Sequence, residues 1–325
     1  GTFDSRIKLW KLETGEEIST LQGHRDTIYA LYMLPDSKQL FSASEDGTIK
    51  LWDLETGEEI STSYDYGSSM SAAITPDGKQ AIVGLSDGRL QILKLGKELN
   101  QASSKQKRTN SMITSISILD EKHAVATSFR TTSNAKQTIY GEEEGIITLW
   151  DTETLRETRA IKNHGFLFSS DVLSRNKTVA TGESGAIKVW DLNKQKQIFS
   201  LKGHRGIVLA VMFLSDGRHL ISGGTDNIRV WDLVSRREVF ILNHGYGSVN
   251  ALAATPDSKQ IIAGSSDGQL TIWNLETREI RRIFKAHTDA VTCVLATSNG
   301  QTLISGSCDH TIKIWDLDSN EKNSL

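Results

Sequence analysis

Histidine, serine and aspartate recur together in three stretches of this 325-residue sequence. Side chains of these types catalyse acyl transfer in hydrolases, where an oriented histidine activates a serine hydroxyl. Such an enzyme needs one set, placed in a cleft beside an oxyanion site. Three copies, each followed by a tryptophan, argue against catalysis, and we predict that the chain is not an enzyme. The three sets, which we expect to be structural, are His24, Ser42, Asp46 and Trp52; His204, Ser222, Asp226 and Trp231; and His287, Ser305, Asp309 and Trp315.

The elements that would hold these side chains repeat about every 41 residues. Seven tryptophans, together with Leu93, end the same strand-like run in successive units. The unit that begins at His24 alternates turns with the strand-like runs TIYALYM, KQLFSAS, TIKLW and GEEIST. Four short strands in each unit are typical of a propeller blade. We therefore expect an all-β fold in which residues 1–325 form a single domain.

Short phrases at fixed positions of the units resemble the WD-repeat family. The units begin with GHRDTIYAL, GHRGIVLAV or AHTDAVTCV and end with IKLWDL, IKVWDL, IRVWDL or IKIWDL. The resemblance covers nearly the whole chain and implies a closed β-propeller that acts as an interaction scaffold. It also implies that each set is a buried hydrogen-bond chain, in which Asp orients His, His meets Ser and Ser reaches the indole N–H.

The number of blades depends on how the two ends of the chain pair. Eight strands end at an anchor residue, whereas each of the other strand types occurs seven times. We favour seven blades, closed when residues 15–20 become the outer strand of the blade that contains residues 290–315. That closure leaves residues 6–10 without an obvious place. The alternative is an eight-bladed or truncated ring whose first two strands precede Gly1 in a longer chain.

Several units depart from the pattern, and we expect their blades to be softer because fewer buried hydrogen bonds hold them. In the unit that ends at Leu93, Val83 and Gly84 stand where the first complete unit has serine and alanine, and packing alone would hold that blade. The other replacements are Ala180 and Ala263 for serine and Ser184 for aspartate, in units that retain His164 and His244.

An insertion lengthens one unit, whose anchors stand 57 residues apart. Residues 129–144 occupy the place of a two-residue turn, so we predict a long hairpin there. Residues 103–110, SSKQKRTN, predict a solvated loop. The WD-repeat resemblance places the histidine loops and the aspartate hairpins on one face, the top face, and loops on a rigid scaffold are where recognition normally occurs. The candidate partner-binding residues there are Arg25, Tyr29, Tyr66, Phe129, Arg130, Tyr140, Phe166, Arg205 and Tyr246.

Composition limits the classes of partner. The 37 Lys and Arg residues nearly balance 40 Asp and Glu, so no general attraction to nucleic acid or to an anionic membrane is expected. No apolar run reaches the roughly 20 residues of a membrane span. Phosphate-binding, dinucleotide and metal-ligand motifs are missing, so we expect no cofactor and no small-molecule substrate. The two cysteines lack metal spacing and fit a reducing, intracellular and cytoplasmic setting.

These observations predict a non-catalytic scaffold that docks proteins or peptides on its top face and rim, within a multiprotein complex. The alternative is a sensory or autoinhibitory propeller module of a larger signalling protein. A third class, a propeller hydrolase or lyase, would require one unique polar cluster in the central channel.

Overall fold

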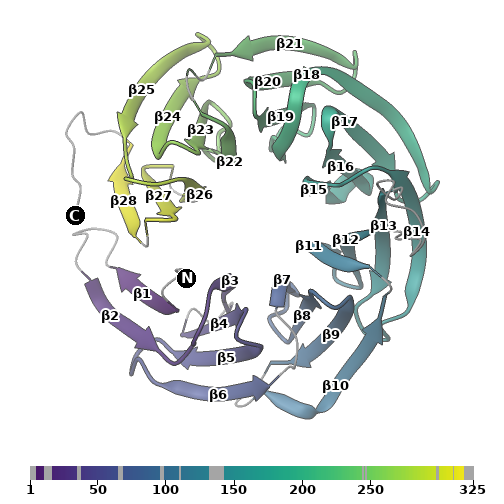
Figure 1. Cartoon of the computed structure of the whole chain (residues 1–325), viewed down its shortest axis with the longest axis vertical. Coiled ribbons are helices and arrows are strands. Elements are labelled where there is room, and N and C mark those ends of the chain that lie inside the picture. The colour runs from purple at the N-terminus through teal and green to yellow at the C-terminus, as the bar shows by residue number, and fades with distance from the viewer. Residues whose placement is uncertain are drawn as a thin grey trace, which may run out of the picture.

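Antiparallel β-sheets follow one another around an open centre in the computed structural model (Figure 1). The structure describes residues 5–10, 17–34, 38–64, 69–95, 99–109, 111–131, 143–243, 245, 247–297, 300–309 and 311–317. Strands make up nearly all of the regular structure, with one short 3₁₀ helix at Ser174–Asn176. The all-β prediction is therefore confirmed.

The first half of the chain forms one two-stranded sheet and three four-stranded blades. The two-stranded sheet contains β1 (Arg6–Trp10) and β2 (Glu17–Gln22). The next blades contain β3 (Ile28–Met33), β4 (Gln39–Ser44), β5 (Thr48–Asp53) and β6 (Glu59–Tyr64); β7 (Ser69–Ile74), β8 (Gln80–Leu85), β9 (Arg89–Lys94) and β10 (Asn100–Arg108); and β11 (Met112–Asp120), β12 (His123–Thr131), β13 (Glu143–Asp151) and β14 (Glu157–His164).

In the second half, a long strand joins two blades. The first part of β18 (Lys196–Phe213) is the outer strand of the blade that contains β15 (Ser169–Leu173), β16 (Thr178–Gly182) and β17 (Ser184–Asp191). Its second part is the inner strand of the next blade, which contains β19 (His219–Gly224), β20 (Ile228–Asp232) and β21 (Arg237–Leu242). The last described sheets contain β22 (Val249–Ala254), β23 (Gln260–Ser265), β24 (Gln269–Asn274) and β25 (Glu279–Lys285); and β26 (Val291–Ala296), β27 (Thr302–Ser307) and β28 (Ile312–Asp316).

The strand pairing at the chain ends differs from the predicted overlap. β2 pairs with β1, with Ile7 opposite Leu21, and not with β28. In Figure 1 the β1–β2 sheet has its own position in the ring, between β28 and β3. Ile7 and Leu21 are both buried against the following blade, in a cluster that includes Trp52. The prediction that residues 15–20 complete the blade of residues 290–315 was wrong, because β2 pairs with β1, the strand that precedes it in sequence.

Two predicted loops are partly strand. Residues 103–108 belong to β10, which pairs with β9, so the solvated loop predicted at residues 103–110 was wrong for most of its length. The predicted hairpin at residues 129–144 is shorter, because β12 continues to Thr131 and pairs there with Glu143 of β13. The backbone ladder between the two strands continues up to Thr131 and Glu143.

The hydrophobic core is divided among the interfaces between successive sheets. Seven clusters of buried residues lie at these interfaces, from the one between β1–β2 and β3–β6 to the one between β22–β25 and β26–β28. At several interfaces, including those at Gly84 and Gly223, a glycine makes room for a branched side chain of the next blade. A Cβ added to Gly84 would lie 2.4 Å from Ile113 Cγ2, and one added to Gly223 would lie 2.4 Å from Val249 Cγ1. Neighbouring sheets therefore approach too closely there for any side chain.

Candidate functional site

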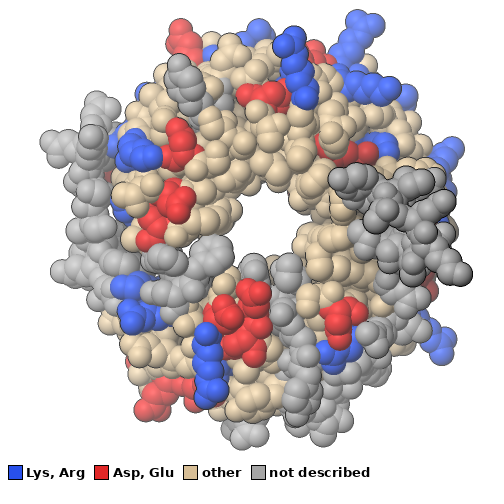
Figure 2. Space-filling model, viewed as in Figure 1, with Lys and Arg blue, Asp and Glu red and all other residues tan. Residues whose placement is uncertain are grey.

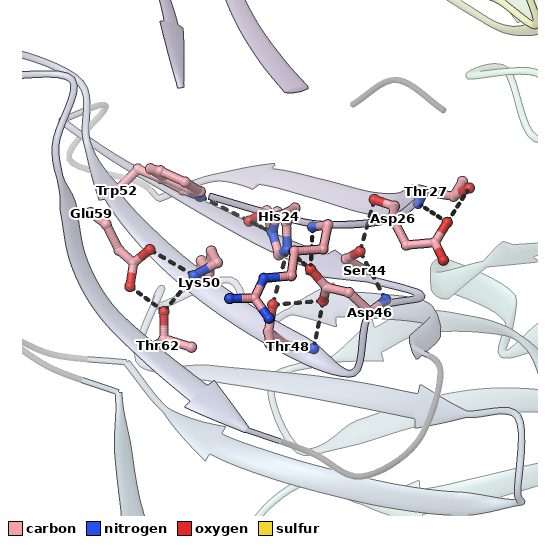
Figure 3. Close-up of polar contacts among 12 residues, drawn as sticks. His24, Asp26, Thr27, Ser44, Asp46, Thr48, Lys50, Trp52, Glu59 and Thr62 are labelled. Atoms are coloured by element: carbon pink, nitrogen blue, oxygen red, sulfur yellow. Dashed lines mark hydrogen bonds and ion pairs between the residues drawn. The ribbon is translucent and has the colours of Figure 1, made fainter. Parts of the chain in front are cut away.

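The first His–Ser–Asp–Trp set forms a continuous hydrogen-bond chain across one blade (Figure 3). His24 Nδ1 lies 3.0 Å from the Asp46 carboxylate, and its Nε2 lies 2.7 Å from Ser42 Oγ. Trp52 Nε1 donates to the same Ser42 oxygen at 2.8 Å. Asp46 also accepts from the backbone N–H of Arg25. The chain joins the segment before β3, the β4–β5 hairpin and the third strand of the blade.

The other two sets have the same geometry. In the second set, His204 lies 2.5 Å from Asp226 and 2.7 Å from Ser222, which accepts from Trp231 at 2.8 Å. The corresponding distances in the third set are 3.0 Å from His287 Nδ1 to Asp309 Oδ2, 2.8 Å from His287 Nε2 to Ser305 Oγ and 2.9 Å from Trp315 Nε1 to Ser305 Oγ.

These serines are unsuited to nucleophilic attack. Ser42, Ser222 and Ser305 are all fully buried, so no substrate carbonyl can reach their hydroxyls. Each hydroxyl has its lone pair engaged by an indole N–H while its proton meets the histidine. A nucleophile must be exposed beside an oxyanion site. The arrangement therefore provides hydrogen-bond partners for polar groups that are buried inside the blade.

Burial and hydrogen bonding also determine the protonation state of the histidine and aspartate side chains in the three sets. Burial lowers the pKa of His204 from its ordinary value of 6.5, although the Asp226 carboxylate acts in the opposite direction. For Asp226, burial opposes ionisation, but hydrogen bonds from His204 and from the Arg205 backbone outweigh it and lower the pKa to about 2. His24 and His287 shift in the same direction as His204. The histidines are therefore neutral near pH 7, with the Nδ1 proton directed to the carboxylate.

We expect acid to destabilise the propeller through these histidines. A histidine whose folded pKa lies below its unfolded value of 6.5 binds fewer protons when folded. Stability is then lost as the pH falls below about 6.5. Urea unfolding at pH 7.5 and pH 5.0 should show this fall, and His204→Gln should reduce it. An equal fall in the parent and in His204→Gln would show that His204 contributes nothing to the acid sensitivity.

The incomplete units use substitutes that the repeat pattern did not reveal. Trp150 donates to Thr148, two residues before it in the same strand, at 2.6 Å. Trp190 donates to Thr181 at 2.9 Å. Thr181 lies two residues after Val179, the partner of Trp190, as Ser222 lies two residues after Leu220, the partner of Trp231. The expectation that Ala180 replaces the serine was therefore wrong, because Thr181 occupies that position. A hydroxyl residue at the serine position was the available signal for Thr181. A threonine two residues before the tryptophan is not a sufficient signal, because Thr271 stands there before Trp273 and the two are not bonded.

A different polar cluster replaces the histidine in the β15–β18 blade. His164 is exposed, and its neighbour Asn163 is buried in its stead. Lys188 Nζ donates to Asn163 at 2.6 Å and lies 2.9 Å from Glu183, which precedes the serine that replaces the usual aspartate. Burial raises the pKa of Glu183, against the effect of Lys188.

Trp273, unlike Trp150 and Trp190, has no threonine acceptor for its indole N–H in the described part of the chain. A substitution that supplies an acceptor should therefore stabilise the protein. Its Nε1 is buried and finds no acceptor among the described residues, and Ala263 occupies the serine position. Ala263→Ser should raise the free energy of unfolding by about 1 kcal/mol by accepting that N–H. Ala126→Ser is the matched control, because Ala126 holds the same register position relative to Trp150, and Trp150 already donates to Thr148. Equal effects of the two changes in urea unfolding would contradict the assignment.

Three phenylalanines form an aromatic cluster on the top face. Phe129, at the start of the insertion, meets Phe166 edge to face with ring centroids 4.9 Å apart. Phe166 lies 5.8 Å from Phe168, which is 41% exposed. Phe129 corresponds in register to Glu45 of the β4–β5 hairpin, and Phe166 and Phe168 follow His164 as Arg25 follows His24. We call Phe129, Phe166 and Phe168 the phenylalanine cluster.

The other predicted partner-binding residues lie apart from this cluster or outside the described residues. Arg25 and Arg205 are exposed, and their backbone N–H groups donate to Asp46 and Asp226. At the C-terminal end of the 129–144 insertion, Glu144 pairs with Lys162 at 2.9 Å. The residues or side chains that fall outside the described part of the structure are those of Tyr29, Tyr66, Arg130, Tyr140 and Tyr246.

A cavity of about 440 Å³ lies between the β18–β21 and β22–β25 blades. Leu214, Phe240 and Leu275 contribute its apolar wall. The hydroxyls of Ser215 and Ser258 contact each other at 2.6 Å. Among the described residues, no group of His, Cys, Asp or Glu could hold a metal ion, and no helix is long and apolar enough to cross a membrane.

Comparisons with known proteins agree with this architecture. A family model described as "WD repeat-containing protein 75 first beta-propeller" matches residues 2–267, and one described as "WD domain, G-beta repeat" matches residues 278–316. Coronin-7 of Mus musculus is 44% identical over 46 residues, and that of Bos taurus is 41% identical over 46. Each alignment covers 14% of this chain and 5% of the Coronin-7 chain.

A solved structure shares the fold. The crystal structure of the computationally designed Ika8 protein superposes with a TM-score of 0.80, at 22% sequence identity. The superposition covers 98% of this chain and 92% of the designed one. Because the first family model matches more than half of the sequence, the chain belongs to the WD-repeat β-propeller family, whose members are generally protein-interaction scaffolds without enzymatic activity.

Proposed function

We propose that this chain is a non-catalytic platform that docks proteins or peptides on its top face and rim, within a multiprotein complex. The observation that carries the proposal is the phenylalanine cluster, where Phe168 is 41% exposed. Aromatic side chains at the centre of an interface commonly contribute most of its binding energy. The cluster joins two blades, so a partner seated on it would contact both.

The frame beneath the cluster supports the same role. Gly145 lies on β13 opposite Phe129, and a Cβ there would lie 2.6 Å from the backbone oxygen of Gly165. Leu167, between the two exposed-side phenylalanines, is buried. The segment that carries Phe166 and Phe168 is therefore held by backbone packing, and a preorganised surface loses less entropy when it binds.

A capture experiment tests the proposal. Tagged parent protein and Phe166→Ala/Phe168→Ala would be used to isolate partners from extracts of the natural source, with quantification of each captured protein. We expect the double variant to lose at least one partner by about tenfold or more. Val234→Ala is the control, because Val234 is 77% exposed and lies at the opposite end of β20 from Asp226. An unchanged set of partners would refute docking at the cluster.

We further propose that the ring has eight blade positions, with β1–β2 at the eighth. Its separate place in Figure 1 supports this, together with the burial of Ile7 and Leu21 against the next blade. The autoinhibitory alternative would use the same top face within one larger protein. Loss of captured partners from the Phe166→Ala/Phe168→Ala variant favours docking of separate proteins.

A further inference from the structure

In two blades, the basic residue that stands two positions before the tryptophan forms an ion pair with a glutamate of the outer strand. These pairs are Lys50 with Glu59 at 2.6 Å (Figure 3), and Arg229 with Glu238. Both glutamates lie opposite the tryptophan in the strand register. In the β15–β18 blade that register position holds Gln197, which is exposed, and the basic residue is Lys188. The ion pair of Lys188 is therefore formed elsewhere.

Lys188 is bonded to two side chains that come from different blades. Its Nζ donates to Asn163 Oδ1 at 2.6 Å and lies 2.9 Å from Glu183 Oε2. Asn163 belongs to β14 of the β11–β14 blade, whereas Glu183 and Lys188 belong to the next blade. Lys and Arg side chains of other blades project from the edge of the disc (Figure 2), but the Lys188 side chain is only 22% exposed. We call Asn163, Lys188 and Glu183 the lysine cluster.

Asparagine at position 163 goes together with the loss of the outer-strand glutamate. Asn163 directly precedes His164, as Gly23 precedes His24. A Cβ added to Gly23 would lie 3.2 Å from Glu59 Oε2, which is tighter than an ordinary contact. In the β15–β18 blade, where the outer-strand residue is the exposed Gln197, Asn163 is accommodated and is 4% exposed.

The lysine cluster lies at both attachment points of residues 165–168, the segment that carries two of the clustered phenylalanines. At the start of the segment, Asn163 Nδ2 donates to the backbone oxygen of Gly165 at 3.4 Å. At its end, the backbone N–H of Phe168 donates at 3.0 Å to the oxygen of Gly182, the residue directly before the glutamate of the cluster. The lysine joins these two points, because it bonds to the asparagine and to the glutamate.

We propose that Asn163, Lys188 and Glu183 are positioning residues that hold residues 165–168 in the conformation in which the phenylalanine cluster docks a partner. Their role is to act through the segment and not to contact the partner. A segment that is already held in its bound conformation loses less entropy when a partner binds. The inference rests on the proposed docking at the phenylalanine cluster and names side chains on which that docking depends.

Stability of the β15–β18 blade is the competing explanation for the lysine cluster. Removal of one partner from a largely buried ion pair is destabilising wherever the pair lies. Lys50 and Glu59 form a pair of the same kind in a blade that does not carry the phenylalanine cluster. A purely structural role therefore predicts that loss of Lys50 and loss of Lys188 have the same consequences for residues 165–168.

Hydrogen exchange of the full chain, followed by mass spectrometry, tests the positioning role. We expect Lys188→Met to speed exchange of the Phe168 N–H by about tenfold, because fewer bonds then oppose local opening of the segment. Exchange within β16 should change by less than about twofold, whereas general loosening of the blade would speed both. Lys50→Met is the matched control and should leave the Phe168 N–H unchanged. Lys188→Arg should exchange as the parent does, since the β18–β21 blade accommodates Arg229 at this position.

Partner capture measures the consequence for docking. At a temperature where every variant is folded, Lys188→Met should capture about tenfold less of the partner that Phe166→Ala/Phe168→Ala loses. Lys50→Met and Lys188→Arg should capture that partner as the parent does. Lys188→Met/Glu183→Gln leaves no carboxylate without its cation and should show the same loss as Lys188→Met, which separates positioning from the effect of a stranded charge.

Unchanged exchange of the Phe168 N–H in Lys188→Met would overturn the inference, as would equal exchange and equal capture by Lys188→Met and Lys50→Met. Full capture by Lys188→Met despite faster exchange would refute the link to docking. Normal exchange in Lys188→Met, together with loss of partners from Phe166→Ala/Phe168→Ala, would refute the positioning role and leave docking at the phenylalanine cluster standing. If that double variant loses no partner, the proposed function fails, and the exchange experiment still decides whether the lysine cluster holds the segment.

Discussion

Ser222→Ala is expected to lower the free energy of unfolding by about 2–4 kcal/mol. The change leaves two buried groups without partners, because Ser222 Oγ lies 2.7 Å from His204 Nε2 and accepts from Trp231 Nε1 at 2.8 Å. Each stranded group costs about 1–3 kcal/mol in the desolvated interior. Urea unfolding followed by tryptophan fluorescence measures the change.

The control for this experiment is Ser200→Ala on β18, the strand that pairs with the Ser222 strand β19. Ser200 lies on the partly exposed outer section of β18, away from the three sets. Its replacement should change stability by less than about 0.5 kcal/mol. A loss below about 1 kcal/mol for Ser222→Ala would mean that the hydrogen-bond chain contributes little to the frame.

Gly223→Val is expected to destabilise the interface between the β18–β21 and β22–β25 blades by about 2–3 kcal/mol. A Cβ at this position would lie 2.4 Å from Val249 Cγ1 and 2.9 Å from its Cβ, so either Val249 or the adjoining sheet must move. Thermal unfolding reports the loss as a lower Tm.

Relief of the clash provides the control for this change. Gly223→Val combined with Val249→Ala should recover part of the stability, because the second change removes Cγ1, the Val249 atom that lies closest, and leaves only its Cβ. Additive losses in the double variant would show that the close approach of the two blades is not the cause.

The repeat pattern predicted the complete sets because four polar or aromatic residues recur at nearly constant spacing. When all four are buried, their polar atoms must form hydrogen bonds with one another. The pattern did not predict that Thr148 and Thr181 serve as acceptors. Thr181 occupies the serine position, but the β16–β17 hairpin is one residue shorter than the β4–β5 hairpin, so counting back from the tryptophan pointed to Ala180. Thr148 comes from the third strand, to which the serine position gives no clue. Glu183 was missed for a similar reason, since it is displaced by one residue from the aspartate position.

The pairing at the chain ends could not be read from alternation alone. A strand with the pattern of β2 fits equally well beside β1 or beside β28, since each offers a third strand that ends in tryptophan. The phenylalanine cluster likewise depends on three-dimensional packing, because Phe129 and Phe166 lie on different blades and their contact leaves no periodic trace. Residue type suggested each of them as an anchor, but not that they meet.

The most direct test of the account is a comparison of stability and partner capture in the same two variants. Ser222 belongs to the rigid frame, whereas Phe168 belongs to the proposed docking surface. At a temperature where both variants are folded, Ser222→Ala should be less stable yet retain its partners, whereas Phe166→Ala/Phe168→Ala should keep most of its stability and lose at least one. Loss of the same partners from Ser222→Ala, with full retention by the phenylalanine variant, would contradict it.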